Sequence, residues 1–422
     1  MWNRRQWQLR VGALAMMAGS AGRWAVAAQT TQPTLASPAP ASGAGGAGKP
    51  VAQLIGANLI SPLTHRGYPL AHNLPAFLNP GPDGAAPKKV WAPVDGTGGD
   101  TKRWEFAQIL TRELCYSFSL AVSQYRRTTH DGFNFFLWNG VRMNGLKIVS
   151  TFEPRYVDET RARRIWRSAY NSFGGESQPD LQLAPSADGY PGLFAALDYL
   201  RETPGKAMWL ASADAPNAPK DEQPNEAALV LVLAQPGFDS GRRPLAHFYA
   251  PVQLNLDELP AAQRAKGKNA ALAMVYQAAI EQAAAQAGLQ AAEIGTWVRH
   301  TGKGTAAAAQ QLAAFSDALY ELKAEPSDLS NPSQNIDMAS LLGKLGANSA
   351  NFSLLMASYA AYAYNHPVMI VSTSDARSVR AMVVMPPPGH RVPEPRKFRY
   401  AASLEEFNRP WWGERLDGKL DI

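Results

Sequence analysis

The sequence has few of the residues on which many catalytic and metal sites depend. It contains one cysteine, Cys115, in 422 residues. A single thiol cannot close an intramolecular disulfide, and it excludes zinc sites built from several cysteines. The seven histidines are scattered, and no pair lies four residues apart around a glutamate. The sequence therefore predicts neither a metal site nor a bound cofactor.

Motifs of nucleophilic catalysis are missing as well. No Gly-x-Ser-x-Gly pentapeptide occurs, and the stretch from Gly302 to Thr305 lacks the upstream glycine spacing of a phosphate loop. Cys115 lies in a segment, 104–125, whose apolar residues have helical spacing. A lone cysteine in such a helix is more often a buried apolar side chain than a nucleophile.

Charge of one sign does not dominate, and long apolar runs are absent. The 41 basic and 35 acidic side chains leave a net charge of +6 that is spread along the chain. Without one basic stripe, nucleic acid is not a predicted partner. The apolar run from Val11 to Gly22 is shorter than the roughly 20 residues that a spanning helix needs. No stable membrane span is predicted once this segment is removed.

The N-terminus is typical of an export signal. Three arginines precede the apolar run, and Ala25-Val26-Ala27 follows it as a cleavage pattern. We interpret residues 1–28 as a signal peptide cleaved after Ala27, which predicts a periplasmic protein. The stretch from Asn3 to Leu9 is also similar to a twin-arginine signal, so both export routes stay open. An unprocessed N-terminus would instead leave the chain anchored at the inner membrane or in the cytoplasm.

Composition divides the remaining chain into four parts. Residues 29–50 are rich in Ala, Pro and Gly and predict a disordered linker. We expect a first α/β half over 51–258, a second over 259–390, and a basic, tryptophan-containing tail over 391–422.

Hydrophobic periodicity predicts alternating strands and helices. The continuous apolar run from Ala227 to Ala234 is typical of a strand buried on both faces. Further strands are expected over 146–152, 207–213, 245–252, 294–298, 368–372 and 381–385, and helices over 157–170, 192–201, 269–288, 306–323 and 352–364. This order favours an α/β fold with mostly parallel sheets covered by helices.

Two segments are candidates for binding a protein partner. The loop from Asp214 to Glu226 is acidic and proline-rich, which makes Asp221 and Glu222 candidate contacts. In the tail, Trp411 and Trp412 lie between Arg409 and Arg415, a composition found in binding hot spots. The alternative, which we prefer, is that both rings dock the tail onto the core.

Three stretches, in order, resemble the thiolase-like superfamily of condensing enzymes. They are Gly192 to Leu197 with the two strands that follow, His300 to Thr305, and Leu342 to Ala350. The resemblance implies two similar α/β halves in a five-layered domain.

The departures from the condensing-enzyme pattern concern its chemistry. The position of the nucleophilic cysteine falls at or beside Gly189 and Tyr190, and Lys344 replaces the second histidine. The first histidine loop is altered around His300 and Lys303. Condensation needs a thiolate and two polarising donors, so the resemblance implies a vestigial cleft and a chain that is not an enzyme, with no catalytic residues.

Over a longer span the chain resembles a bacterial virulence-factor family that includes the lipase adaptor of type VI secretion systems. The matching stretches are Ser61 to Leu63, Arg66 to Pro69, Leu197 to Leu200, Asp214 to Pro216, Asp221 to Glu226, Ala234 to Phe238, Arg243 to Ala246, Leu341 to Ala350 and Pro410 to Arg415. The family implies an adaptor that holds a phospholipase effector and delivers it to the secretion spike protein.

Two hypotheses of different classes follow. The first is a non-catalytic adaptor that captures a lipase-type effector. The second is an acyl-ligand-binding protein or divergent enzyme that retains the cleft, with His300, Lys303 or Lys344 as its polar groups.

Overall fold

The computed structural model describes residues 48–60, 74, 146–155, 157–171, 179–214, 227–301, 306–326, 334–339, 343, 345–373, 377–392, 411–414 and 416. All of them belong to one compact unit, Gly45–Ile422. The predicted signal peptide and the predicted helix over 104–125 lie outside the described residues. Within these residues, no helix is both long and apolar enough to cross a membrane.

The strands form one mixed sheet in the order β3-β2-β4-β5-β1-β6-β11-β10-β8-β9, with β12 paired to β1 and β7 paired to β11. Their bounds are β1 Ala52–Ile60, β2 Lys147–Phe152, β3 Asp180–Pro185, β4 Ala207–Asp214, β5 Ala227–Ala234, β6 Ala246–Phe248, β7 Val252–Asn255, β8 Thr296–Thr301, β9 Asn335–Asp337, β10 Val368–Thr373, β11 Ser378–Met385 and β12 Trp411–Trp412.

The pairing pattern repeats in the two halves. In the first half, β2 pairs in parallel with β3 and β4, and the antiparallel strands β5 and β1 follow. In the second half, β8 pairs in parallel with β9 and β10, and the antiparallel strands β11 and β7 follow. The antiparallel pair β1–β6 joins them. The predicted α/β class with two similar halves is therefore confirmed.

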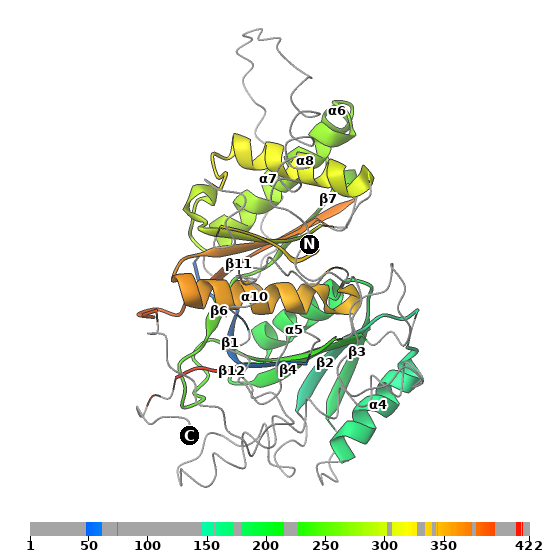
Figure 1. Cartoon of the computed structure of the whole chain (residues 1–422), viewed down its shortest axis with the longest axis vertical. Coiled ribbons are helices and arrows are strands. Elements are labelled where there is room, and N and C mark those ends of the chain that lie inside the picture. Colours follow the sequence, from blue (N-terminus) through cyan, green and yellow to red (C-terminus); the bar gives the residue numbers. More distant parts are fainter. Residues whose placement is uncertain are drawn as a thin grey trace, which may run out of the picture. The chain divides into compact units, whose positions relative to one another are not determined.

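Helices cover both sheet halves and also separate them (Figure 1). The helices are α4 Glu159–Asn171, α5 Tyr190–Glu202, α6 Ala261–Arg264, α7 Lys268–Gln286, α8 Ala306–Glu321 and α10 Ser349–Tyr364, with short 3-10 turns η2 Leu256–Glu258, η3 Ala291–Glu293 and η4 Gly346–Asn348. Helices α5 and α10 lie between the two halves of the sheet, α7 and α8 lie on one outer side, and α4 lies on the other.

The five layers follow from where the apolar side chains point. Strand β5 is buried along its whole length because its side chains alternate between two cores. Leu229, Leu231 and Leu233 pack in the central core with α5 and α10, whereas Val230 and Val232 pack in the outer core beneath α4. A third core joins α7 and α8 to the second half of the sheet.

Local sequence explains where the main helices begin and end. Helix α5 has a proline in its first turn, where the missing N–H costs nothing. The alanine-rich helix α7 ends just before Gly288, which has a φ of 72°. Helix α10 ends at Asn365, which also adopts the left-handed conformation.

Two details of the prediction are corrected. The sheet is mixed and not mostly parallel, because short connections such as the one between β10 and β11 produce antiparallel neighbours. The segment predicted as one strand over 245–252 forms β6 and β7, which both pair with β11. Pro251 lies in the break, and proline has no N–H to donate to a sheet.

Candidate functional site

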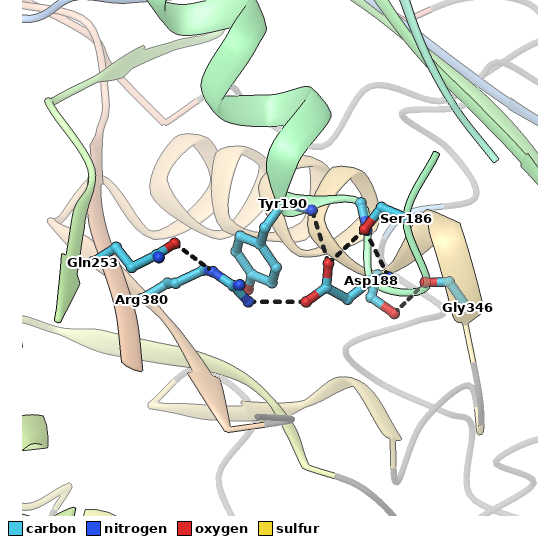
Figure 2. A network of polar contacts seen from close by, with 8 residues as sticks. Ser186, Asp188, Tyr190, Gln253, Gly346 and Arg380 are labelled. Atoms are coloured by element: carbon cyan, nitrogen blue, oxygen red, sulfur yellow. Dashed lines mark hydrogen bonds and ion pairs between the residues drawn. The ribbon is translucent and has the colours of Figure 1, made fainter. Parts of the chain in front are cut away.

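Asp188 joins the N-termini of the two central helices (Figure 2). Its side-chain Oδ1 accepts a hydrogen bond from the backbone N–H of Tyr190, at 3.2 Å, at the start of α5. Its main-chain carbonyl accepts one from the N–H of Ala350, at 2.9 Å, in the first turn of α10. Ser186 donates to the same Oδ1 at 2.8 Å. One residue thus satisfies donors of both helix ends, which would otherwise lack partners.

The second half of the molecule contributes a row of polar residues that faces Asp188. His300 on β8, Ser372 on β10, Arg380 on β11 and Gln253 on β7 are direct cross-strand partners. Residues in direct register point to the same face of a sheet, so the row lies on the side of α5 and α10. We call these four residues the polar row.

An ion pair links the polar row to α5 (Figure 2). Arg380 Nη1 lies 2.9 Å from Asp188 Oδ2, and Arg380 Nε donates to Gln253 Oε1 at 2.9 Å. The side chains of Arg380 and Asp188 are 13% and 25% exposed. Because the pair is largely removed from water, loss of either charge would leave the other one poorly solvated and unpaired.

Tyr190 fills the space between the helix and the polar row. Its ring is buried, and the guanidinium carbon of Arg380 lies 5.0 Å from its centroid. Burial raises the pKa of the Tyr190 hydroxyl well above its usual value, although a hydrogen bond with Ser372 opposes the shift. The phenol therefore stays protonated at neutral pH and is a poor nucleophile.

His300 lies at the end of the polar row. Burial lowers the pKa of its imidazole, although the charges of Asp337 and Asp188 oppose the shift. The neighbouring Arg299 forms an ion pair with Asp337 at 3.0 Å. The His300 imidazole is therefore neutral at neutral pH, because desolvation is the larger of the two effects.

Gly189 has a backbone that a larger residue could not easily adopt. Its φ is 80°, and a Cβ atom added there would lie 2.5 Å from the carbonyl oxygen of Ala347. Both features favour glycine. At the position predicted to match the cysteine of condensing enzymes, Gly189 packs against the Ala347 carbonyl, and the next residue, Tyr190, buries its ring.

The structure brings three of the predicted cleft residues together: Gly189, Tyr190 and His300. Lys303 and Lys344, and the predicted partner contacts Asp221, Glu222, Arg409 and Arg415, lie outside the described residues. Among the described residues, no group of three or more His, Cys, Asp or Glu side chains converges as a metal site would require.

The tail tryptophans lie against the core. Strand β12 pairs with β1, and Trp411 is 4% exposed. Its ring makes edge-to-face contacts with Tyr359 and Tyr362 on α10, at 5.9 and 5.5 Å between centroids. This placement agrees with the docking alternative, because a buried ring contributes to folding and not to an exposed binding surface.

Close backbone contacts hold the tail in place. The ring of half-buried Trp412 lies directly over Gly56, which has no side chain to obstruct it. Arg242 donates to the carbonyl of Gly413 at 2.8 Å and lies near the Trp412 ring. The N–H of Arg243 donates to the carbonyl of Glu414 at 2.8 Å.

Sequence reasoning missed the residues that complete the network. Asp188, Arg380 and Gln253 were not among the predicted site residues. The position of Asp188 just before the α5 start is a capping signal that could have pointed to it. Arg380 had no such local signal.

A family model matches the second half of the chain. Residues 245–386 match the family described as Type VI lipase adapter protein Tla3, C-terminal. The matched range runs from just before β6 to just after β11, so it includes the whole polar row. No curated protein was found to match the chain.

Several solved structures are similar in fold. The ishigamide ketosynthase/chain length factor is 16% identical, with a TM-score of 0.48, over 79% of this chain and 99% of that one. The oxazolomycin ketosynthase domain of Streptomyces albus is 12% identical, with a TM-score of 0.46, over 83% and 99%. A variant of OleA from Xanthomonas campestris is 11% identical, with a TM-score of 0.46, over 80% and 99%. These similarities concern the fold alone.

Proposed function

We propose that this chain is a non-catalytic adaptor that captures a lipase-type effector for type VI secretion. The observation that carries the proposal is the match of residues 245–386 to the C-terminal family of a type VI lipase adapter. That range coincides with one complete half of the repeated fold. A family match over one continuous half of the fold supports a shared role for that half better than a match over scattered segments would.

The geometry around α5 supports the non-catalytic part of the proposal. Gly189 has no side chain to attack a substrate, and the Tyr190 hydroxyl is held protonated by burial. The Arg380 guanidinium, which could stabilise an anion, is already paired with Asp188. The charged and polar groups of the site are therefore engaged with one another.

Co-expression tests the proposal most simply. The full chain would carry an affinity tag and be produced with the lipase-type effector of the same secretion system, with an unrelated secreted lipase as control. We expect the effector to co-purify at near-equal stoichiometry and the control lipase to be lost. Loss of both lipases, with a folded adaptor on the resin, would contradict the capture role.

Two exposed apolar residues of the matched half allow the contact to be located. Leu312 and Tyr320 lie on α8 and are 37% and 67% exposed. Val392, outside the matched range, is 53% exposed and provides a matched control. If the matched half makes the contact through α8, Leu312→Ser with Tyr320→Ser weakens capture, and Val392→Ser does not.

Delivery to a spike protein and an exported location are the finer parts of the proposal. The spike partner rests on the family resemblance, and the periplasmic location rests on residues 1–28. Cell fractionation followed by N-terminal sequencing checks the location, with cleavage after Ala27 as the expected result. A spike protein recovered in the effector complex, but not without the adaptor, would support delivery.

The acyl-ligand alternative has its own test. Long-chain acyl-coenzyme A would be titrated into the purified chain and followed by calorimetry. Because Asp188, Tyr190 and Arg380 already contact one another in the site, we expect no saturable heat. Saturable binding that is lost in an Arg380→Met variant would favour the alternative.

A further inference from the structure

Helix α4 carries exposed arginines that form no ion pair with the described residues. Arg163, Arg164 and Arg167 are exposed, and no carboxylate in the described part of the chain pairs with them. We call these three residues the α4 arginine cluster. Nearby arginines differ, because Arg161 pairs with Asp158 at 3.3 Å and Arg155 pairs with Glu153 at 2.9 Å.

The three arginines lie on one side of the helix. Arg167 follows Arg163 by four positions and Arg164 by three, which makes the side chains neighbours on the surface. Four residues correspond to about 6 Å along a helix axis. The α4 arginine cluster is therefore a compact patch of positive charge and not a long stripe.

Folding alone does not account for the cluster. Like charges at these spacings repel and weaken a helix. Cations stabilise a helix when they lie in its last turn, and the last turn of α4 has no basic residue. Unpaired charges that oppose local stability are expected where a surface serves binding.

The rest of α4 is fixed to the sheet. Ala162, Ile165 and Trp166 are each 4% exposed, and Trp166 Nε1 donates to Ser150 Oγ at 2.7 Å. Figure 1 shows α4 on the outer side of the sheet, away from α5 and α10. The apolar side chains described on α4 thus pack against the sheet, and the helix presents the cluster from a rigid support.

We propose that the α4 arginine cluster binds a short acidic segment of a partner protein, with two or three carboxylates close together. A guanidinium matches a carboxylate through two parallel hydrogen bonds, and this geometry favours arginine over lysine. Exposed Glu159 lies four positions before Arg163 and borders the cluster, and Asp158 is already paired with Arg161. The Glu159 carboxylate repels an extended anionic surface such as a bilayer or a duplex, whereas a compact acidic group can contact the three arginines alone.

The inference is independent of the adaptor role. Helix α4 lies in the first half of the molecule, outside residues 245–386. Loss of effector capture would leave this proposal standing, and loss of acidic-peptide binding would leave the adaptor role standing.

Fluorescence anisotropy of the full chain tests the proposal. The probe is a labelled peptide with four consecutive glutamates in a glycine-serine background. The cluster variant carries Arg163→Gln, Arg164→Gln and Arg167→Gln. The control variant carries Arg264→Gln, Lys266→Gln and Lys268→Gln, which replace three other exposed cations and lower the net charge equally.

We expect the cluster variant to bind the peptide about tenfold more weakly than the natural chain, and the control variant within about twofold. Raising NaCl from about 50 to about 300 mM should weaken binding by the natural chain. Equal losses in both variants would overturn the proposal, because overall charge would then explain the attraction. No loss in the cluster variant would overturn it too.

Further measurements keep the result interpretable. Circular dichroism melts establish that both variants fold. A charge-reversed variant, with glutamate at the three cluster positions, should bind a tetra-lysine peptide that the natural chain does not bind. Tighter cluster-dependent binding to vesicles with about 30% phosphatidylserine, or to a short DNA duplex, would overturn the proposal in favour of an extended anionic partner.

Discussion

The polar network around α5 and the outer surface of α4 use charged side chains in opposite ways. At α5, Arg380 is 13% exposed and paired with Asp188 across the two halves. On α4, Arg163, Arg164 and Arg167 are exposed and have no ion-pair partner among the described residues. Removing one partner of a largely buried pair leaves the other charge uncompensated and destabilises the fold, whereas exposed charges without a partner can bind another molecule.

The largest expected effect concerns the tail, because Trp411 packs in the central core with α5 and α10. Trp411→Ala should lower the free energy of unfolding by about 4 kcal/mol, because it removes a buried ring from contact with Tyr359 and Tyr362. Trp412→Ala, at a half-buried position, should cost about 1 kcal/mol. Urea denaturation measures both. Equal small losses would show that the tail is not part of the folded core.

Breaking the ion pair should rank second. Arg380→Met leaves the Asp188 carboxylate without its cation in a largely buried site, and should cost about 3 kcal/mol of unfolding free energy. Asp188→Asn keeps a cap for α5 and makes a double-variant cycle available. We expect the two changes to couple by about 1 to 2 kcal/mol. Additive losses would mean that the pair does not join the halves energetically.

The close contact at Gly189 should come next. Gly189→Ala adds a Cβ atom 2.5 Å from the Ala347 carbonyl oxygen at a φ of 80°, and should cost about 2 kcal/mol. Gly205 is a matched control, because its φ is 69° and nothing lies within 4 Å of an added Cβ. Gly205→Ala should cost about 1 kcal/mol from backbone strain alone. Equal losses for the two variants in thermal melts would show that the contact between Gly189 and Ala347 does not affect stability.

Lowering the pH should reduce stability through buried histidines such as His300 in the network, and the α4 arginines should not contribute to this loss. Burial lowers the pKa values of His300, His247 and His366, so the unfolded chain takes up protons that the folded chain resists. Stability is therefore complete above about pH 6.5 and falls as the pH drops below it. We expect a loss of about 1 kcal/mol between about pH 7 and pH 5.5 in denaturant titrations.

A substitution at each site checks the origin of this slope. His300→Asn should make the pH dependence of unfolding shallower. Arg164→Gln should leave it unchanged, since arginine stays protonated throughout this range. An identical slope in the natural chain and the His300→Asn variant would assign the effect to other groups.

The smallest expected effect is on the α4 surface itself. Arg164→Gln should change the free energy of unfolding by less than about 0.5 kcal/mol, and relief of repulsion from Arg167 favours a slight gain. Chemical denaturation measures the change. A loss above about 1 kcal/mol would show a folding role for this arginine and would weaken the contrast with the buried network.

The fold was predictable where local signals are strong. Strand β5 was predicted with its observed bounds, because eight consecutive apolar residues have few alternatives. Helix α7 was predicted within two residues of its observed bounds from its alanine content and Gly288. Strand β9 has three residues and β12 has two, so they form through their partner strands and leave no periodic signal.

The candidate site was predictable in part. Gly189, Tyr190 and His300 were identified through a family resemblance, and the structure brings them together. Arg380 lies 192 positions from Asp188 in the sequence, so periodicity and local motifs could not reveal their pairing. The antiparallel pairing of β1 with β5 and β6 was missed for a related reason, since these partner strands lie far from β1 in the sequence.

Calorimetric titration of the purified lipase-type effector into the purified full chain tests the adaptor role most directly. We expect saturable binding with one effector per chain and a dissociation constant of about 1 μM or tighter, the range of specific protein complexes. No saturable heat with the folded effector at about 100 μM, confirmed by separate elution of the two proteins in gel filtration, would contradict the adaptor role.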